Sequence, residues 1–111
     1  MAETVDAQAT TIGLGMLVVV CVLLYGTVVD PTPFGVESMT LAMWVFAAMF
    51  ATVALLHAVV GRGDMALAHG GAAVGWVLIL VGTGVGQVTV GLVALAAGGI
   101  YIVRTTVRER D

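Results

Sequence analysis

The run of residues 65–103, MALAHGGAAVGWVLILVGTGVGQVTVGLVALAAGGIYIV, contains no charged side chain. Its length of 39 residues is about twice the roughly 20 apolar residues that one helix needs to cross the hydrocarbon core of a bilayer. As a single helix it would be roughly 58 Å long at 1.5 Å per residue, so the run must fold back. The stretch from Gly82 to Gln87 lies at its midpoint and combines glycines with polar side chains, which predicts a turn. The run therefore contains two membrane spans.

Two further uncharged runs, residues 7–29 and 38–61, precede this one. Each is long enough for one crossing. Pro31 and Pro33 lie between them, and the two prolines predict a loop because proline does not continue a helix. The sequence thus predicts an all-α integral membrane protein, a single domain over residues 1–111 that forms an up-down-up-down four-helix bundle. Its expected spans are residues 11–29, 39–60, 66–82 and 87–104.

The composition independently indicates a lipid environment. Hydrophobic residues make up 60% of the 111 residues and charged residues only 10%, with a mean hydropathy of +1.13. A soluble domain has roughly 25% charged residues, and so few charges could not solvate the surface of a domain of this size. The chain also leaves no room for a separate soluble catalytic module. We therefore expect no enzymatic activity and no cofactor.

The basic residues predict the orientation. The sequence has no lysine and only four arginines, namely Arg62, Arg104, Arg108 and Arg110. With four spans, the second connection and the C-terminus lie on one side of the membrane, so all four arginines share a compartment. The positive-inside rule makes that compartment the cytoplasm. We therefore expect a multi-pass cell-membrane protein with both termini in the cytoplasm and with these arginines as topology anchors.

Two histidines flank the second connection. His57 precedes Arg62 by five residues and His69 follows Asp64 by five, which places both imidazoles at the same depth, roughly 7 to 8 Å from the turn. They could form a metal site, a haem site, or a contact to a quinone or lipid headgroup. Helix axes ~8 to 10 Å apart leave no room for a haem, and for a metal only Asp64 could add a ligand. We expect both histidines to be structural, each bonded to a backbone carbonyl or extending to the interface, with no metal, no cofactor and no catalytic residue.

Small residues predict where the later spans pack. Gly71 and Gly75 form a G-x-x-x-G pair, and Ala94 with Gly98 forms a similar pair in the fourth span. Small residues allow helix backbones to approach closely in lipid. We expect the glycine pair to face the fourth span around Ala94 and Gly98. The opposite side of the third span is expected to face the second span and carries His69, Ala72, Ala73 and Trp76.

Length and span number resemble the small multidrug resistance transporters. The membrane-embedded glutamate of that family's first span, however, has no counterpart between Thr11 and Val29. A fluoride-channel interpretation also fails, because we find neither an intramembrane arginine nor a phenylalanine-rich polar pore stretch. We expect an accessory or assembly subunit that packs against membrane lipids and a larger membrane complex or a second copy of itself. The alternative is a small oligomeric transporter or channel. A net charge of −3 gives no reason to expect nucleic-acid binding.

Overall fold

The computed structural model describes residues 2–110, with side chains described from residue 6 onward. In this part of the chain four α-helices are long and apolar enough to cross a membrane. They are α1 (Ala2–Val28), α2 (Ser38–Val59), α3 (Gly63–Val81) and α4 (Val85–Arg110). The prediction of an all-helical chain with four apolar helices is confirmed.

All four helices begin before the expected spans, and the largest differences are in α1 and α4. The first helix begins at Ala2 rather than at residue 11, and α4 continues to Arg110 rather than ending at residue 104. A helix need not end where hydrocarbon ends, because water can hydrogen-bond its terminal groups. Arg108 and Arg110 lie in the last turn of α4, where positive charge interacts favourably with the unpaired carbonyls of the helix C-terminus.

Short connections join the helices. Between α1 and α2, the backbone N–H of Thr32 donates to the Asp30 carboxylate over 2.9 Å. The following single turn, η1 (Pro33–Gly35), contains Phe34 in the left-handed region with φ 59°. Gly61, with φ +80°, permits the tight turn between α2 and α3. The last turn consists of residues 82–84, within the glycine-rich stretch that the sequence singled out.

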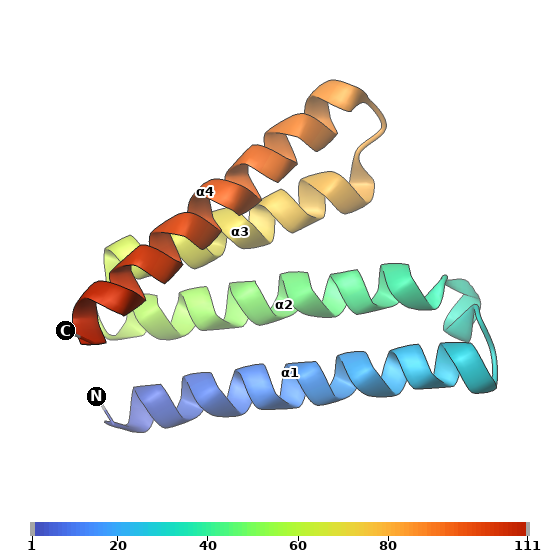
Figure 1. The fold of residues 1–111 in the computed structure, drawn as a ribbon, viewed down its shortest axis with the longest axis horizontal. Coiled ribbons are helices and arrows are strands. Elements are labelled where there is room, and N and C mark those ends of the chain that lie inside the picture. Colours follow the sequence, from blue (N-terminus) through green and yellow to red (C-terminus); the bar gives the residue numbers. More distant parts are fainter. Residues whose placement is uncertain (1, 111) are drawn as a thin grey trace.

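Each helix packs against its neighbours in the chain, so the four helices form an open row (Figure 1). Figure 1 shows α1 and α2 side by side, with the α3–α4 hairpin running obliquely away from them. Both ends of the described chain lie at the end of the molecule where α2 turns into α3 (Figure 1). The first and last helices of the row, α1 and α4, do not pack extensively against each other. The four helices are therefore arranged as an open row and not as a closed bundle in which the first and last helices also pack together.

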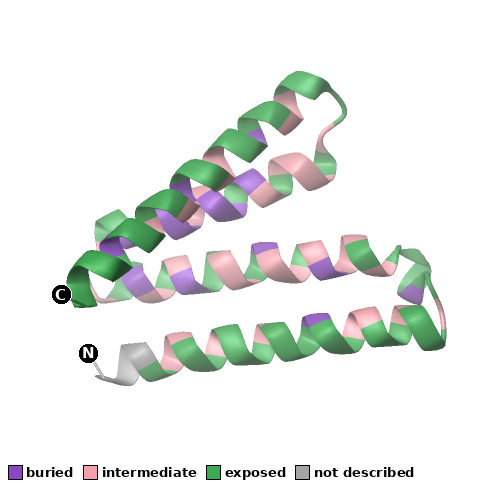
Figure 2. Cartoon of the chain, in the orientation of Figure 1, coloured by how far each residue is buried: buried purple, intermediate pink, exposed green. Residues whose placement is uncertain are grey.

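The third helix forms the centre of the packing (Figure 2). It supplies six buried residues, whereas Val19 is the only buried residue described in α1. The buried hydrophobic residues are mostly alanines, and among the described residues no large side chain is fully buried. Small side chains on α3 allow both α2 and α4 to approach it, because backbones can come close where no bulky group separates them.

Close approach also joins α1 to α2. A Cβ atom at Gly15 would overlap the Met49 side chain, and one at Gly26 would overlap Ser38. The two glycines are eleven residues apart, about three helical turns, and so share one face of α1. The sequence predicts small-residue packing only in the later spans, so the close approach at Gly15 and Gly26 was not expected.

Candidate functional site

The two histidines meet at the turn between α2 and α3. His57 lies in the last turn of α2, and its ring centroid is 5.0 Å from that of His69, with the ring planes 26° apart. The turn that brings them together is closed by the backbone N–H of Arg62, which donates to the His57 carbonyl over 2.9 Å. Phe50 continues the cluster, with its ring centroid 6.1 Å from that of His69.

The two imidazoles differ in their hydrogen bonding. Nδ1 of His69 lies 2.9 Å from the carbonyl oxygen of Met65. A carbonyl can only accept, so Nδ1 carries a proton, and in the neutral form of the ring Nε2 is left as an acceptor. His57 is also buried, but neither of its ring nitrogens has a partner in the described part of the chain. His57 therefore does not bond a backbone carbonyl in the described part of the chain, which was one of the two environments expected for it.

The cluster offers a metal ion few ligands. Among residues 6–110, no group of three or more histidine, cysteine, aspartate or glutamate side chains could hold a metal. Asp64, the only further ligand that the sequence suggested, is engaged elsewhere. Its carboxylate accepts hydrogen bonds from Arg62 and from the Tyr101 hydroxyl.

Arg62, Asp64, Tyr101 and Glu109 form a polar clasp between the α2–α3 turn and the end of α4. Arg62 lies 3.2 Å from the Asp64 carboxylate and 2.7 Å from that of Glu109. The Tyr101 hydroxyl donates to Asp64 over 2.8 Å. The hydrogen bond to Asp64, and to a lesser extent that to Glu109, raises the pKa of the Arg62 guanidinium above its ordinary value. The clasp holds α4 near the histidine pair.

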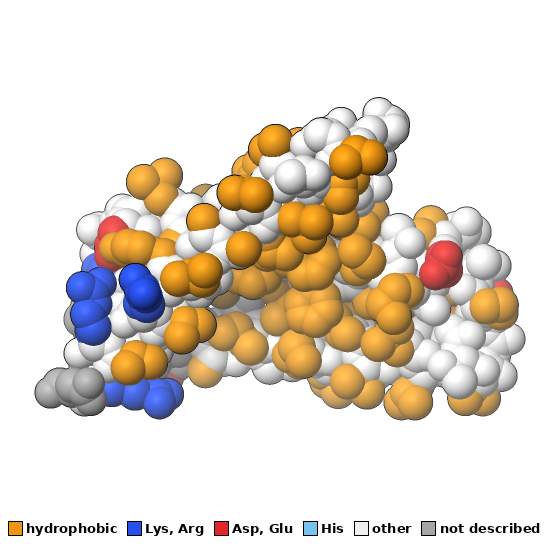
Figure 3. Space-filling model, turned by 45° about the horizontal axis from the view of Figure 1, so that its top comes forward, with side chains coloured by type: hydrophobic (Ala, Val, Ile, Leu, Met, Phe, Trp, Pro, Cys, Tyr) orange, Lys and Arg blue, Asp and Glu red, His pale blue; other side chains and the backbone are white. Residues whose placement is uncertain are grey.

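The other expected anchors lie on α4. Arg104 and Arg108 line one shallow hollow together with Tyr101, so they share a helix face. Arg104, Arg108 and Arg110 are all exposed. Figure 3 shows arginine side chains gathered at one end of the molecule, with apolar side chains covering its middle.

Glycines bring α3 and α4 together at two levels. A Cβ atom at Gly75 would lie 2.6 Å from the carbonyl oxygen of Gly91, and one at Gly98 would lie 2.5 Å from that of Ala68. The Gly98 position also faces Ala72, whose Cβ would be 3.4 Å away. Ala72 thus lies against α4, whereas it was expected on the side of the third span that faces the second.

The other two residues expected at the contact between the third and fourth spans, Gly71 and Ala94, are less closely packed. A Cβ atom at Gly71 would meet nothing within 4 Å, and Ala94 is only half-buried. Residues 68, 72 and 75 repeat at intervals of four and three and form one face of α3, and residue 71 lies at the edge of that face, roughly 65° from its centre at 100° per residue. Trp76 does face α2, where its ring stacks on Phe46 with centroids 5.8 Å apart.

Two further buried polar atoms lack a partner in the described part of the chain. They are the indole Nε1 of Trp76 and the hydroxyl oxygen of Thr105. Sequence reasoning did not single out Thr105. It is one helical turn beyond Tyr101, so both residues lie on the same side of α4.

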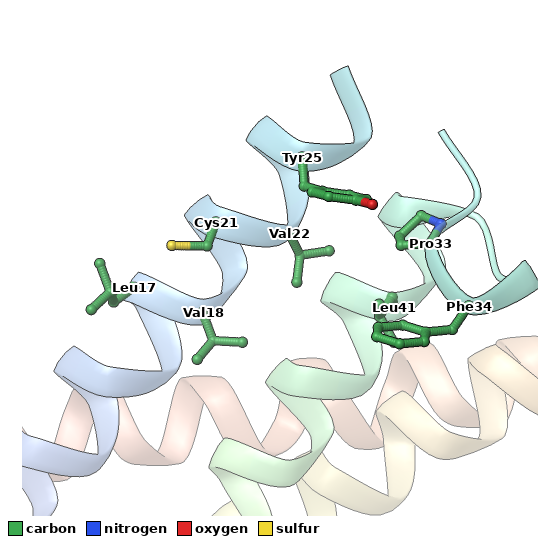
Figure 4. Close-up of a pocket in the computed structure, with 8 residues that line it drawn as sticks. All are labelled: Leu17, Val18, Cys21, Val22, Tyr25, Pro33, Phe34 and Leu41. Atoms are coloured by element: carbon green, nitrogen blue, oxygen red, sulfur yellow. The ribbon is translucent and has the colours of Figure 1, made fainter. Parts of the chain in front are cut away.

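An apolar groove lies between α1 and α2 at the end away from the histidines (Figure 4). Its volume is about 490 Å³, and the ring of Phe34 forms part of its wall although that residue is 96% exposed. Cys21 and Tyr25 supply its only polar side-chain atoms. The groove has the chemistry to hold an apolar chain.

No protein-family model, no curated protein sequence and no solved structure matches this chain.

Proposed function

We propose that the chain is a four-span integral membrane protein that acts as an accessory or assembly subunit, by packing against a partner helix, with no catalytic activity of its own. The observation that carries this proposal is the open row of helices. The helix at one end of the row, α1, packs mainly against α2. Only 6% of the residues in its apolar stretch are buried. It is therefore free to pack against another membrane helix.

The distribution of charge supports the orientation. Arg62, Arg104, Arg108 and Arg110 are at the end of the molecule that carries both termini (Figures 1 and 3). Asp30 and Glu37 are in the connection at the opposite end of α1 and α2. Under the positive-inside rule, this arrangement favours an up-down-up-down topology with both termini in the cytoplasm.

The outer side of α1 suits a partner helix. Ala9 and Gly13 are exposed, and a Cβ atom at Gly13 would meet nothing within 4 Å. Residues four apart share a helix face, so the two form a small-x-x-x-small pair. In lipid, association depends on close van der Waals packing, which small residues allow. We propose that a transmembrane helix of the partner packs there.

Native mass spectrometry after extraction from the source membrane in mild detergent tests this proposal. A Gly13→Leu variant should lose a membrane protein that co-purifies with the parent at a fixed ratio. Gly99→Leu is the matched control, since a Cβ atom at Gly99 in α4 also meets nothing within 4 Å. It should keep the partner.

Other outcomes of the same measurement have clear meanings. A complex of identical chains would favour the small oligomeric transporter or channel. A monomer that carries only lipid, or equal loss of the partner in both variants, would contradict the proposed packing on α1.

A further inference from the structure

A second cavity lies where α1, α2 and α3 meet, beside the histidine pair. Its volume is about 250 Å³. The first helix contributes Ile12 and Met16, which are 42% and 43% exposed, so this wall of the cavity belongs to the surface of the molecule. The remaining lining residues come from α2 and α3 and are Phe46, Met49, Phe50, Val53 and His69.

His69 is the only lining residue whose side chain can form a conventional hydrogen bond. It is 6% exposed, and its Nδ1–H is committed to the Met65 carbonyl. The polar atom that remains is Nε2, an acceptor in this tautomer. His57 stacks against His69 but does not line the cavity. The cavity thus combines an apolar lining with one hydrogen-bond acceptor.

An acceptor in hydrocarbon needs a donor, because no water is present there to supply one. A buried polar group that lacks a partner loses free energy relative to its state in water. A free metal cation fits poorly, since no carboxylate lines this cavity and burying an uncompensated charge is costly. An anion is not attracted by an unprotonated nitrogen. The chemistry therefore favours a neutral, mostly apolar molecule with one hydroxyl group.

We propose that this cavity binds a small aromatic alcohol from the bilayer, with the hydroxyl donating to Nε2 of His69. The size fits one or two fused rings, because an apolar cavity of roughly 150 Å³ is enough to hold benzene and this one has about 250 Å³. Phe46 and Phe50 provide ring faces for stacking or edge contacts. Met16 and Met49 provide polarisable thioethers that pack well against aromatic rings.

This inference goes beyond the proposed subunit role and does not depend on a partner protein. The probes that test it are 2-naphthol and 2-methoxynaphthalene, which share the ring system but differ in that only the first can donate a hydrogen bond. Both are added to the purified full chain in lipid bicelles. Calorimetric titration should give binding about tenfold weaker, or worse, for the methoxy compound, because it leaves the acceptor unpaired.

The ring-nitrogen resonances of histidine report the contact directly. The chain has only two histidines, so a His57→Gln variant leaves His69 alone in the spectrum of ¹⁵N-histidine-labelled protein. We expect the Nε2 resonance of His69 to move on addition of 2-naphthol and to stay in place on addition of 2-methoxynaphthalene. His69→Phe should remove the preference for the hydroxyl compound, whereas His57→Phe should retain it.

A pair of neighbouring substitutions tests the position of the site. Met16→Trp should fill the cavity and abolish binding, whereas Leu17→Trp should not, because Leu17 does not line this cavity. Equal affinity for the two probes on the unmodified protein would overturn the proposal without relying on any variant. That result would mean that the hydroxyl group donates no hydrogen bond to His69. Equal loss in the two tryptophan variants would also overturn it.

Discussion

Replacing Gly75 by alanine tests the close contact between α3 and α4. The added Cβ would lie 2.6 Å from the Gly91 carbonyl oxygen and 2.8 Å from the Leu95 backbone nitrogen. Ordinary Cβ contacts begin at 3.4 Å, so the helices must separate locally by about 0.8 Å, the difference between 3.4 and 2.6 Å. Both obstructing atoms belong to the backbone, and neither can move aside by a change of rotamer.

The magnitude follows from two opposing effects. Overpacking of this kind costs about 1 to 3 kcal/mol, while replacing glycine by alanine inside a helix gains up to about 1 kcal/mol. Gly71→Ala is the matched control, because it has the same gain and a Cβ there meets nothing within 4 Å. We expect Gly75→Ala to unfold with a free energy about 1 to 3 kcal/mol below that of Gly71→Ala.

Unfolding by sodium dodecyl sulfate from mild detergent, followed by circular dichroism, measures this difference. Equal stability of the two alanine variants would refute the close approach of α3 to α4. The larger Gly75→Leu should separate the helices further and destabilise the monomer. If that variant instead kept its monomer stability but lost a partner, the Gly75 face would be an intermolecular interface.

Two further predictions concern the polar groups near the α2–α3 turn. His57→Phe removes two buried ring nitrogens that lack a partner while keeping an aromatic ring, so the stability in detergent should be unchanged or higher by about 1 kcal/mol. A clear loss in thermal unfolding would show that His57 has a hydrogen-bonding role. Arg62→Gln breaks the ion pairs to Asp64 and Glu109, and its small loss of stability should vanish at about 1 M salt, where charges are screened within ~3 Å. Tyr101→Phe removes a hydrogen bond to Asp64, and its effect should depend less on salt. Identical salt dependence of the two variants would contradict the assignment of ion pairs to Arg62 and of a hydrogen bond to Tyr101.

The sequence was sufficient to predict four apolar helices and the equal distance of the two histidines from the second connection. Charged residues are costly in hydrocarbon, so their positions delimit the apolar runs. The glycine-rich midpoint then places the last turn. The equal spacing of His57 and His69 from the tight second connection brings their rings together, because both helices rise by the same distance per residue.

Contacts that depend on how two helices cross were not predictable from the sequence. The pairing of Gly75 with Gly91 requires the register of α4 on α3, which no local signal sets. The contact between Tyr101 and Asp64 joins residues 37 positions apart. The lack of partners for the His57 nitrogens likewise depends on what surrounds the ring after packing.

Accessibility of single cysteines in intact cells tests the proposed four-span topology most directly. In a Cys21→Ala background, cysteines replace Thr32, Gly63, Thr83 and Thr106, all of which are exposed in the structure. We predict that a membrane-impermeant thiol reagent labels Thr32→Cys and Thr83→Cys from outside, and that Gly63→Cys and Thr106→Cys react only after the membrane is opened. Labelling of Thr106→Cys but not of Gly63→Cys from outside would mean three spans and would contradict the account.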